Sequence, residues 1–279
     1  MQTILVATDF SHASHNAALY AIRLAEALDA RLVLFHAYKE LAVPVADTLP
    51  AVDERSMLIQ TRERLKEEAL AIDSQNLVDV ETWYKEGETT DMILEAAKET
   101  HASLIIAGIR KADYGLKRIL GSTVTHLTKK THQPLLLVPE DYHYTAVETI
   151  AMASEYDVLP QTGNHVIKML QTIAKRFHSK IYLIRVTDNQ LWKAYEIVNK
   201  PYELLKRLQI FEPVYECLQG KDITRELNEF IHTSQVNLLV MLPHKRNFWE
   251  RCVFKSTTRE MIFETQVPLL LLPDVLHGS

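Results

Sequence analysis

Short apolar runs alternate along the chain with longer stretches in which apolar residues recur at helical spacing. This alternation is typical of β-α-β units built on a parallel sheet. In the first half it predicts strands near 3–8, 31–37, 79–84, 103–107 and 134–138, and helices near 12–29, 52–72, 89–101 and 122–132. In the second half it predicts strands near 149–154, 180–186, 211–216, 236–241 and 268–272. We therefore expect an α/β protein made of two doubly wound, five-stranded parallel-sheet domains.

The two halves of the chain repeat each other. Residues 3–10 are echoed by residues 149–156, and residues 133–139 return as 266–273 with one extra residue. A tandem duplication explains this pattern, with domains at 1–143 and 144–279. The last strand of each half is almost wholly apolar. In the strand order 3-2-1-4-5, which we expect for each domain, this strand would lie at the edge of its sheet, where an apolar strand needs cover.

Composition and charge exclude several classes of protein. The chain is 47% hydrophobic and 24% charged, with a formal net charge of −5, which is ordinary for a globular protein. It has no dense block of lysine and arginine, so we expect no nucleic-acid partner. No apolar run approaches the roughly 20 residues of a membrane span, and the first residues do not resemble a signal peptide. We therefore expect a cytoplasmic protein with no membrane partner. Cys217 and Cys252 lack the spacing of a disulfide framework or zinc site.

Glycine is scarce, with only 7 in 279 residues, yet Gly108, Gly115 and Gly121 cluster after the fourth predicted strand. A glycine at a strand end allows a ligand to approach bare backbone. Gly121 and Ser122 would begin a helix whose free N–H groups and positive dipole end suit phosphate. The same residues also fit a simple turn followed by a helix cap, so the pattern alone leaves both interpretations open.

These residues resemble a motif of the universal stress protein family. ATP-binding members carry Gly-x2-Gly-x9-Gly-Ser/Thr after the fourth strand and an aspartate after the first strand. Asp9 matches that aspartate, Gly108 matches the first motif glycine, and Gly121 with Ser122 matches the last pair. Lys111 stands where the middle glycine belongs, so its side chain could block the phosphates or neutralise them. The resemblance covers the whole chain as two tandem copies.

The resemblance implies an adenine-nucleotide alpha-hydrolase-like fold that binds ATP, with Mg²⁺ as a companion of the nucleotide, in the N-terminal domain only. Adenine and ribose would lie near the ends of the first, second and fourth strands, and the phosphates near Lys111 and the start of the following helix. The implied nucleotide-binding residues are Ala7, Thr8, Asp9, His36, Ala37, Ala107, Gly108, Lys111, Gly121, Ser122 and Thr123. In the second copy the three glycine positions hold Leu242, Lys245 and Lys255, and Glu155 replaces the aspartate. We expect that copy to bind no nucleotide, although its cationic loop could take another anion.

The leading hypothesis is a non-enzymatic stress-response module, regulatory or signalling, that binds an adenine nucleotide. Two alternatives remain: a structural or interaction protein that acts through oligomerisation, and a weak ATPase. We expect no catalytic residue, because the sequence has no Gly-x-Ser-x-Gly motif and no Gly-x4-Gly-Lys-Ser/Thr phosphate loop. We expect no metal site, because His12 and His15 have no third ligand nearby in sequence. Family members pair through their last strand, so the resemblance implies an internal pseudo-dimer that sets 134–138 against 268–272. A homodimer and an unidentified protein partner are further expected partners.

Overall fold

Strands and helices alternate in both halves of the computed structural model, which describes residues 2–39, 54–75, 77–110, 122–153, 164–188, 206–242, 261 and 264–273. The first half contains β1 (Gln2–Ala7), α1 (His12–Leu28), β2 (Ala30–Tyr38), α2 (Glu54–Ile72), β3 (Val80–Glu86), α3 (Thr89–Glu99), β4 (Leu104–Ile109), α4 (Ser122–Lys130) and β5 (Leu135–Pro139). The second half contains β6 (Thr149–Ala153), α5 (Asn164–Phe177), β7 (Lys180–Thr187), η1 (Gln209–Phe211), β8 (Val214–Gln219), α8 (Ile223–Thr233), β9 (Leu238–Met241) and β10 (Leu269–Leu271).

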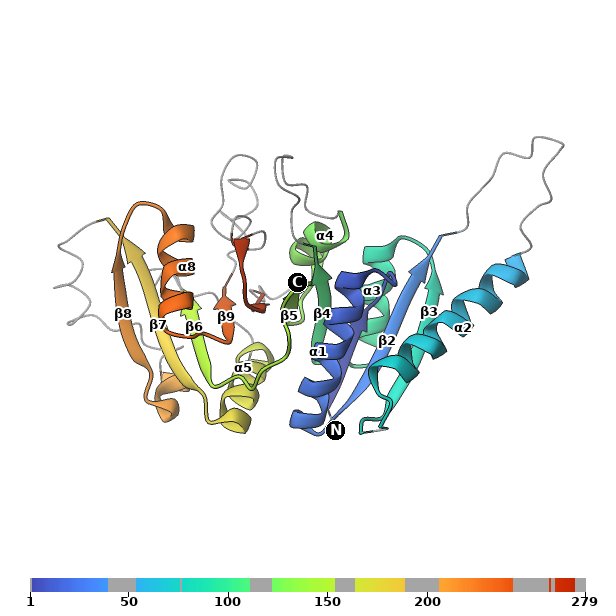
Figure 1. Cartoon of the computed structure of the whole chain (residues 1–279), viewed down its shortest axis with the longest axis horizontal. Coiled ribbons are helices and arrows are strands. Elements are labelled where there is room, and N and C mark those ends of the chain that lie inside the picture. Colours follow the sequence, from blue (N-terminus) through green and yellow to red (C-terminus); the bar gives the residue numbers. More distant parts are fainter. Residues whose placement is uncertain are drawn as a thin grey trace.

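All of these strands form one ten-stranded sheet in the order β3-β2-β1-β4-β5-β10-β9-β6-β7-β8 (Figure 1). The first five read 3-2-1-4-5, which confirms the predicted order. The other five have the same order, read from the opposite end. The division of the chain at residue 143 stays a prediction; the segment 140–148 connects β5 to β6.

The two halves meet through their last strands. β5 and β10 pair antiparallel, with Leu135 opposite Leu271 and Leu137 opposite Leu269. The two apolar edges therefore cover each other, as the sequence predicted. Every other strand pair in the sheet is parallel. The carboxyl ends of the strands consequently point in opposite directions in the two halves.

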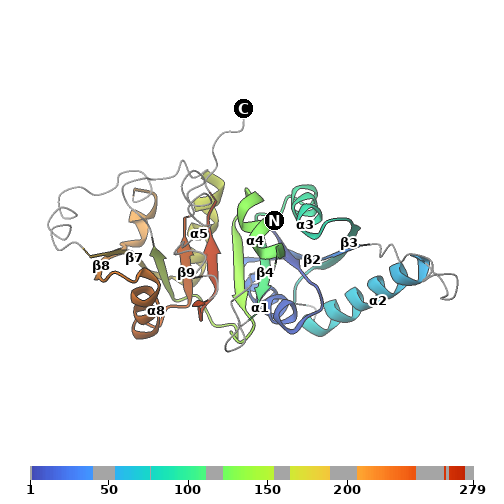
Figure 2. The same ribbon diagram turned by 90° about the horizontal axis from the view of Figure 1, so that it is seen from above.

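Helices cover both faces of the sheet (Figure 2). Residues of α1, α2 and α5 pack in one core cluster, and residues of α3, α4 and α8 pack in the other. Alternate residues of a strand serve alternate faces: Ile4 and Val6 of β1 belong to the first cluster and Leu5 to the second. Because each central strand is buried on both faces, it reads as a continuous apolar run in the sequence.

One predicted strand is displaced. The pattern predicted a strand at 211–216, whereas β8 begins at Val214, after the short 3-10 helix η1. Pro213 has no N–H to donate to a neighbouring strand, and Glu212 has a positive φ of 48°. Both features interrupt an extended strand, so pairing begins only after them. Among the described helices, none is long and apolar enough to cross a membrane.

Candidate functional site

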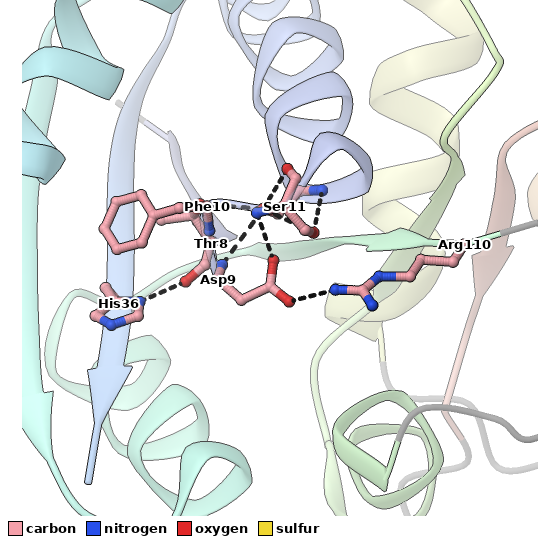
Figure 3. A network of polar contacts seen from close by, with 7 residues as sticks. Thr8, Asp9, Phe10, Ser11, His36 and Arg110 are labelled. Carbon is pink, nitrogen blue, oxygen red and sulfur yellow. Dashed lines mark hydrogen bonds and ion pairs between the residues drawn. The ribbon is translucent and has the colours of Figure 1, made fainter. Parts of the chain in front are cut away.

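The site lies where the strand order reverses in the first half. The chain leaves β1 through α1 to reach β2 on one side, and β4 lies on the other side of β1. In open α/β sheets the crevice at such a point, beyond the carboxyl ends of the strands, is the usual place for a ligand. Asp9 follows β1 and Arg110 follows β4, and their side chains meet across this point, with 3.3 Å between Arg110 Nη2 and Asp9 Oδ2 (Figure 3).

A compact turn between β1 and α1 holds Asp9 in place. The Ser11 N–H donates to Asp9 Oδ1 at 3.0 Å, and the Asp9 N–H donates to the Ser14 hydroxyl at 3.3 Å. Ser11 also caps α1, because its hydroxyl oxygen accepts from the Ser14 N–H. Phe10 adopts a positive φ of 60° in this turn, a conformation that a bulky side chain seldom takes without support from its surroundings.

Asp9 is ionised at neutral pH. Burial by itself would raise the pKa of Asp9, but hydrogen bonds from Ser11 and Ser14 and the charge of Arg110 outweigh it, so the pKa lies below its ordinary value. The carboxylate remains accessible, since 62% of the Asp9 side chain is exposed. The turn thus presents a fixed negative group to solvent at the end of β1.

His36 lies beside this turn, near the end of β2. Its Nδ1 lies 2.7 Å from the Thr8 carbonyl oxygen, so Nδ1 must carry the hydrogen of that bond. Burial, together with the charge of Arg64, lowers the pKa of His36 despite the opposing effects of Thr8 and Asp9. The ring is therefore neutral at neutral pH, and Nε2 keeps a lone pair that can accept a hydrogen bond.

An aromatic stack adjoins the turn. The rings of Phe10 and His36 pack with 4.6 Å between their centroids. The guanidinium of Arg64, from α2, lies 4.2 Å above the centre of the Phe10 ring. A cation at this distance is attracted to the face of the ring. The stack closes the α2 side of the site and adds a positive charge to it.

Gly108 is required by packing. A Cβ at this position would lie 2.2 Å from the carbonyl oxygen of Ala13 and 2.8 Å from the backbone nitrogen of Ser14. Helix α1 therefore crosses β4 so closely that no side chain fits between them. The sequence pattern suggested bare backbone for a ligand at this glycine, whereas in the structure the close approach of α1 excludes a side chain.

Several predicted site residues lie near the ends of the neighbouring strands β1, β2 and β4, and two begin α4. Ala7, Thr8 and Asp9 lie at the end of β1, His36 and Ala37 near the end of β2, Ala107 and Gly108 near the end of β4, and Ser122 and Thr123 begin α4. Other predicted or discussed residues lie outside the described part of the chain, namely Lys111, Gly115, Gly121, Glu155, Lys245, Cys252 and Lys255. Leu242 is described and is buried in the core, with 9% of its surface exposed.

Sequence reasoning missed the two arginines of the site. Arg110 could have been found from its position directly after β4, because that position faces the same edge as Asp9. Arg64 gave no such signal, since it is one of several charged residues along α2. Neither histidine near the start of α1 belongs to a metal cluster: His15 Nδ1 lies 2.9 Å from Glu68 Oε1, and the described residues contain no group of three metal-binding side chains.

The sequence and the fold both match known proteins. The model of the universal stress protein family matches residues 1–139. The universal stress protein YxiE of Bacillus subtilis is 32% identical over 144 residues, which cover 48% of this chain and 97% of that protein. A universal stress protein of Mycobacterium tuberculosis is 30% identical over 142 residues, which cover 50% of this chain but only 48% of that protein.

A solved structure matches both halves at once. The crystal structure of a universal stress protein from Archaeoglobus fulgidus superimposes with a TM-score of 0.74 and covers 98% of each chain. At 13% sequence identity, this likeness concerns the fold.

Proposed function

Because this chain belongs to the universal stress protein family, we propose that it is a stress-response regulatory module that binds an adenine nucleotide of the ATP type in its first half. The observation that carries the proposal is the ionised Asp9, held by Ser11 at the point where the strand order reverses. A fixed carboxylate there is suited to accept hydrogen bonds from the hydroxyls of a ribose.

The ion pair between Asp9 and Arg110 would rearrange on binding. Both side chains are more than half exposed, at 62% and 69%, and such pairs contribute only about 0–1 kcal/mol. The hydroxyls of a ribose could therefore replace Arg110 as partners of the Asp9 carboxylate at little cost in free energy. The released guanidinium would then be available for the phosphates, which it can bind through two parallel hydrogen bonds.

The rest of the nucleotide would occupy neighbouring elements. Nε2 of the neutral His36 can accept a hydrogen bond from the ligand. The phosphates would lie toward Lys111 and the start of α4, where helix N–H groups are free. Any Mg²⁺ would be bound mainly by the phosphates, as is usual for this ion. We propose no nucleotide in the second half, where Leu242 replaces the first motif glycine and is buried.

A titration of the full chain with ATP tests this proposal. We expect Asp9→Ala to weaken ATP binding about tenfold or more, the usual effect of losing a hydrogen bond to a charged group. Glu155→Ala, at the corresponding position of the second copy, should leave the affinity unchanged. Equal affinities for wild type and Asp9→Ala would refute the assignment, and no binding by wild type would favour a protein that acts through oligomerisation.

The variant Arg110→Ala distinguishes binding of the phosphates from binding of the nucleoside. We expect it to weaken ATP binding while leaving adenosine binding unchanged, because adenosine has no phosphates for the guanidinium to contact. Equal losses for both ligands would place Arg110 at the nucleoside instead.

We further propose that the protein binds nucleotide without turning it over. The pKa values of Asp9 and His36 are both lowered, which makes each group a weaker general base. Steady phosphate release from ATP that is lost in Ser122→Ala would contradict this and favour a weak ATPase.

A further inference from the structure

A cavity of about 320 Å³ lies on the face covered by α1 and α2. Its walls come from the middle of α1, from the end of α2 and the turn that follows it, and from the segment that connects β5 to β6. The residues that carry the argument are Leu19, Tyr20, Arg23, Leu77, His143 and Tyr144. Tyr20 lies nine residues along α1 from Ser11, or roughly 14 Å at the rise of an α-helix. The cavity therefore does not overlap the proposed nucleotide site, and its volume falls within the range of small-molecule sites.

Tyr20 is the central polar group of this cavity. Its side chain is 2% exposed, and its ring packs against Tyr144 at 5.2 Å between centroids. Within the described part of the chain, no residue forms a hydrogen bond with its hydroxyl. Burial, together with Tyr142 and Tyr144, raises the pKa of Tyr20 far above its ordinary value, so the phenol stays neutral. Because Tyr20 lines the cavity, its hydroxyl can donate to a ligand that brings a hydrogen-bond acceptor.

One cation and one carboxylate border the cavity. The only nitrogen of Arg23 paired among the described residues is Nη1, which lies 3.1 Å from Glu26 Oε2 in an exposed ion pair. The carboxylate of Asp73 is already engaged, because its two oxygens accept from the N–H groups of Leu77 and Val78. The cavity thus offers the Tyr20 hydroxyl and a guanidinium as hydrogen-bond donors, and the oxygens of its acidic residue are held by the turn.

One wall of the cavity is apolar. Leu19 and Leu77 are among the few large hydrophobic residues that the structure leaves exposed, at 40% and 44%. Both border the cavity, where Ile22 and Ile72 continue the apolar surface. A ligand with an apolar body would remove this surface from water.

We propose that this cavity binds a small organic carboxylate with an apolar body. The carboxylate accepts hydrogen bonds from the Tyr20 hydroxyl and from Arg23, and the body packs against Leu19 and Leu77. Because His143 and Tyr144 also border the cavity, the ligand touches the segment that connects the two halves.

Benzoate is a suitable probe, since it combines one carboxylate with an apolar ring. Calorimetric titration of the full chain should give saturable binding at millimolar concentration. Tyr20→Phe and Arg23→Gln should each weaken it about tenfold, because each removes one hydrogen bond to a charged group. Tyr142→Phe is the matched control: the Tyr142 hydroxyl already pairs with Thr145 Oγ1 at 2.9 Å and does not line the cavity. Its affinity for benzoate should equal that of wild type.

Two further measurements make the assignment specific. Benzamide, which lacks the negative charge, should bind about tenfold more weakly than benzoate. Saturating ATP should not displace benzoate, which keeps this test separate from that of the nucleotide site. The proposal is overturned if wild type shows no saturable benzoate binding, if Tyr20→Phe binds as tightly as wild type, or if ATP competes. Tyr20→Phe keeps the packed ring, so its fold can be checked by the unfolding midpoint.

Discussion

The contact between Gly108 and α1 makes a sharp prediction about Gly108→Ala. The added Cβ would lie 2.2 Å from Ala13 O and 2.4 Å from Ala13 C, both of which are backbone atoms. Backbone cannot rotate away as a side chain can, so α1 would have to retreat from β4 by about 1 Å to restore an ordinary contact. The first turn of α1 carries Ser11 and Ser14, which hold Asp9, so the site would move with it.

The expected cost follows from two opposing effects. Inserting an extra methyl group into a packed region typically costs about 1–3 kcal/mol, and a rigid neighbour favours the upper end. Replacing glycine by alanine also reduces the conformational freedom of the unfolded chain, which stabilises the folded state by about 0.4–1 kcal/mol. We therefore expect Gly108→Ala to lower the free energy of unfolding by about 2 kcal/mol.

Urea unfolding of the purified variants measures this loss. Gly220→Ala, in the second half, is the matched control. The Cβ added there would meet the flexible side chain of Glu226 at 2.5 Å, and that side chain can swing aside. We expect this control to stay within about 0.5 kcal/mol of wild type. If Gly108→Ala and Gly220→Ala unfold at the same urea concentration as wild type, the packing explanation of Gly108 is wrong.

Two further predictions concern the same helix and the neighbouring strand. Asn16 is 8% exposed, and its Nδ2 donates to Pro139 O and Tyr142 O at 2.9 and 3.0 Å. Asn16→Leu would leave these two carbonyls unpaired, so we expect it to lower the free energy of unfolding in urea by about 1–3 kcal/mol. An unchanged unfolding midpoint would contradict this. The pKa of His36 is lowered from 6.5 by burial, so the unfolded chain takes up the proton first and stability should fall as the pH drops below 6.5. His36→Gln should lose less stability than wild type between about pH 7 and 5, as measured by urea midpoints at several pH values, and parallel curves would assign the pH dependence to other groups.

The architecture could be predicted because burial leaves a clear trace in the sequence. Central strands buried on both faces read as apolar runs, and the two last strands were recognisable as apolar edges that needed cover. The structure pairs them through Leu135–Leu137 and Leu269–Leu271. The displaced start of β8 shows the limit of such a pattern, because Phe211 reads as part of the strand and the effect of Pro213 is local.

The candidate site could be predicted only in part. Asp9 was identified because it matches the aspartate that follows the first strand in universal stress proteins, and His36 because the same resemblance places the end of the second strand beside the nucleotide. The pairing of Asp9 with Arg110 and the position of Arg64 over Phe10 depend on how separate elements pack. The spacing of residues in the sequence does not indicate such contacts. Likewise, the sequence shows that Gly108 ends a strand, but it does not show which backbone comes close to it.

The central claim is that the chain holds one adenine nucleotide, in its first half. Native mass spectrometry of the full chain with ATP counts bound nucleotides directly. We predict one ATP per chain, lost in Gly121→Val and retained in Lys255→Val at the corresponding position of the second copy. A wild-type chain that binds no ATP, or that binds two, would contradict the account.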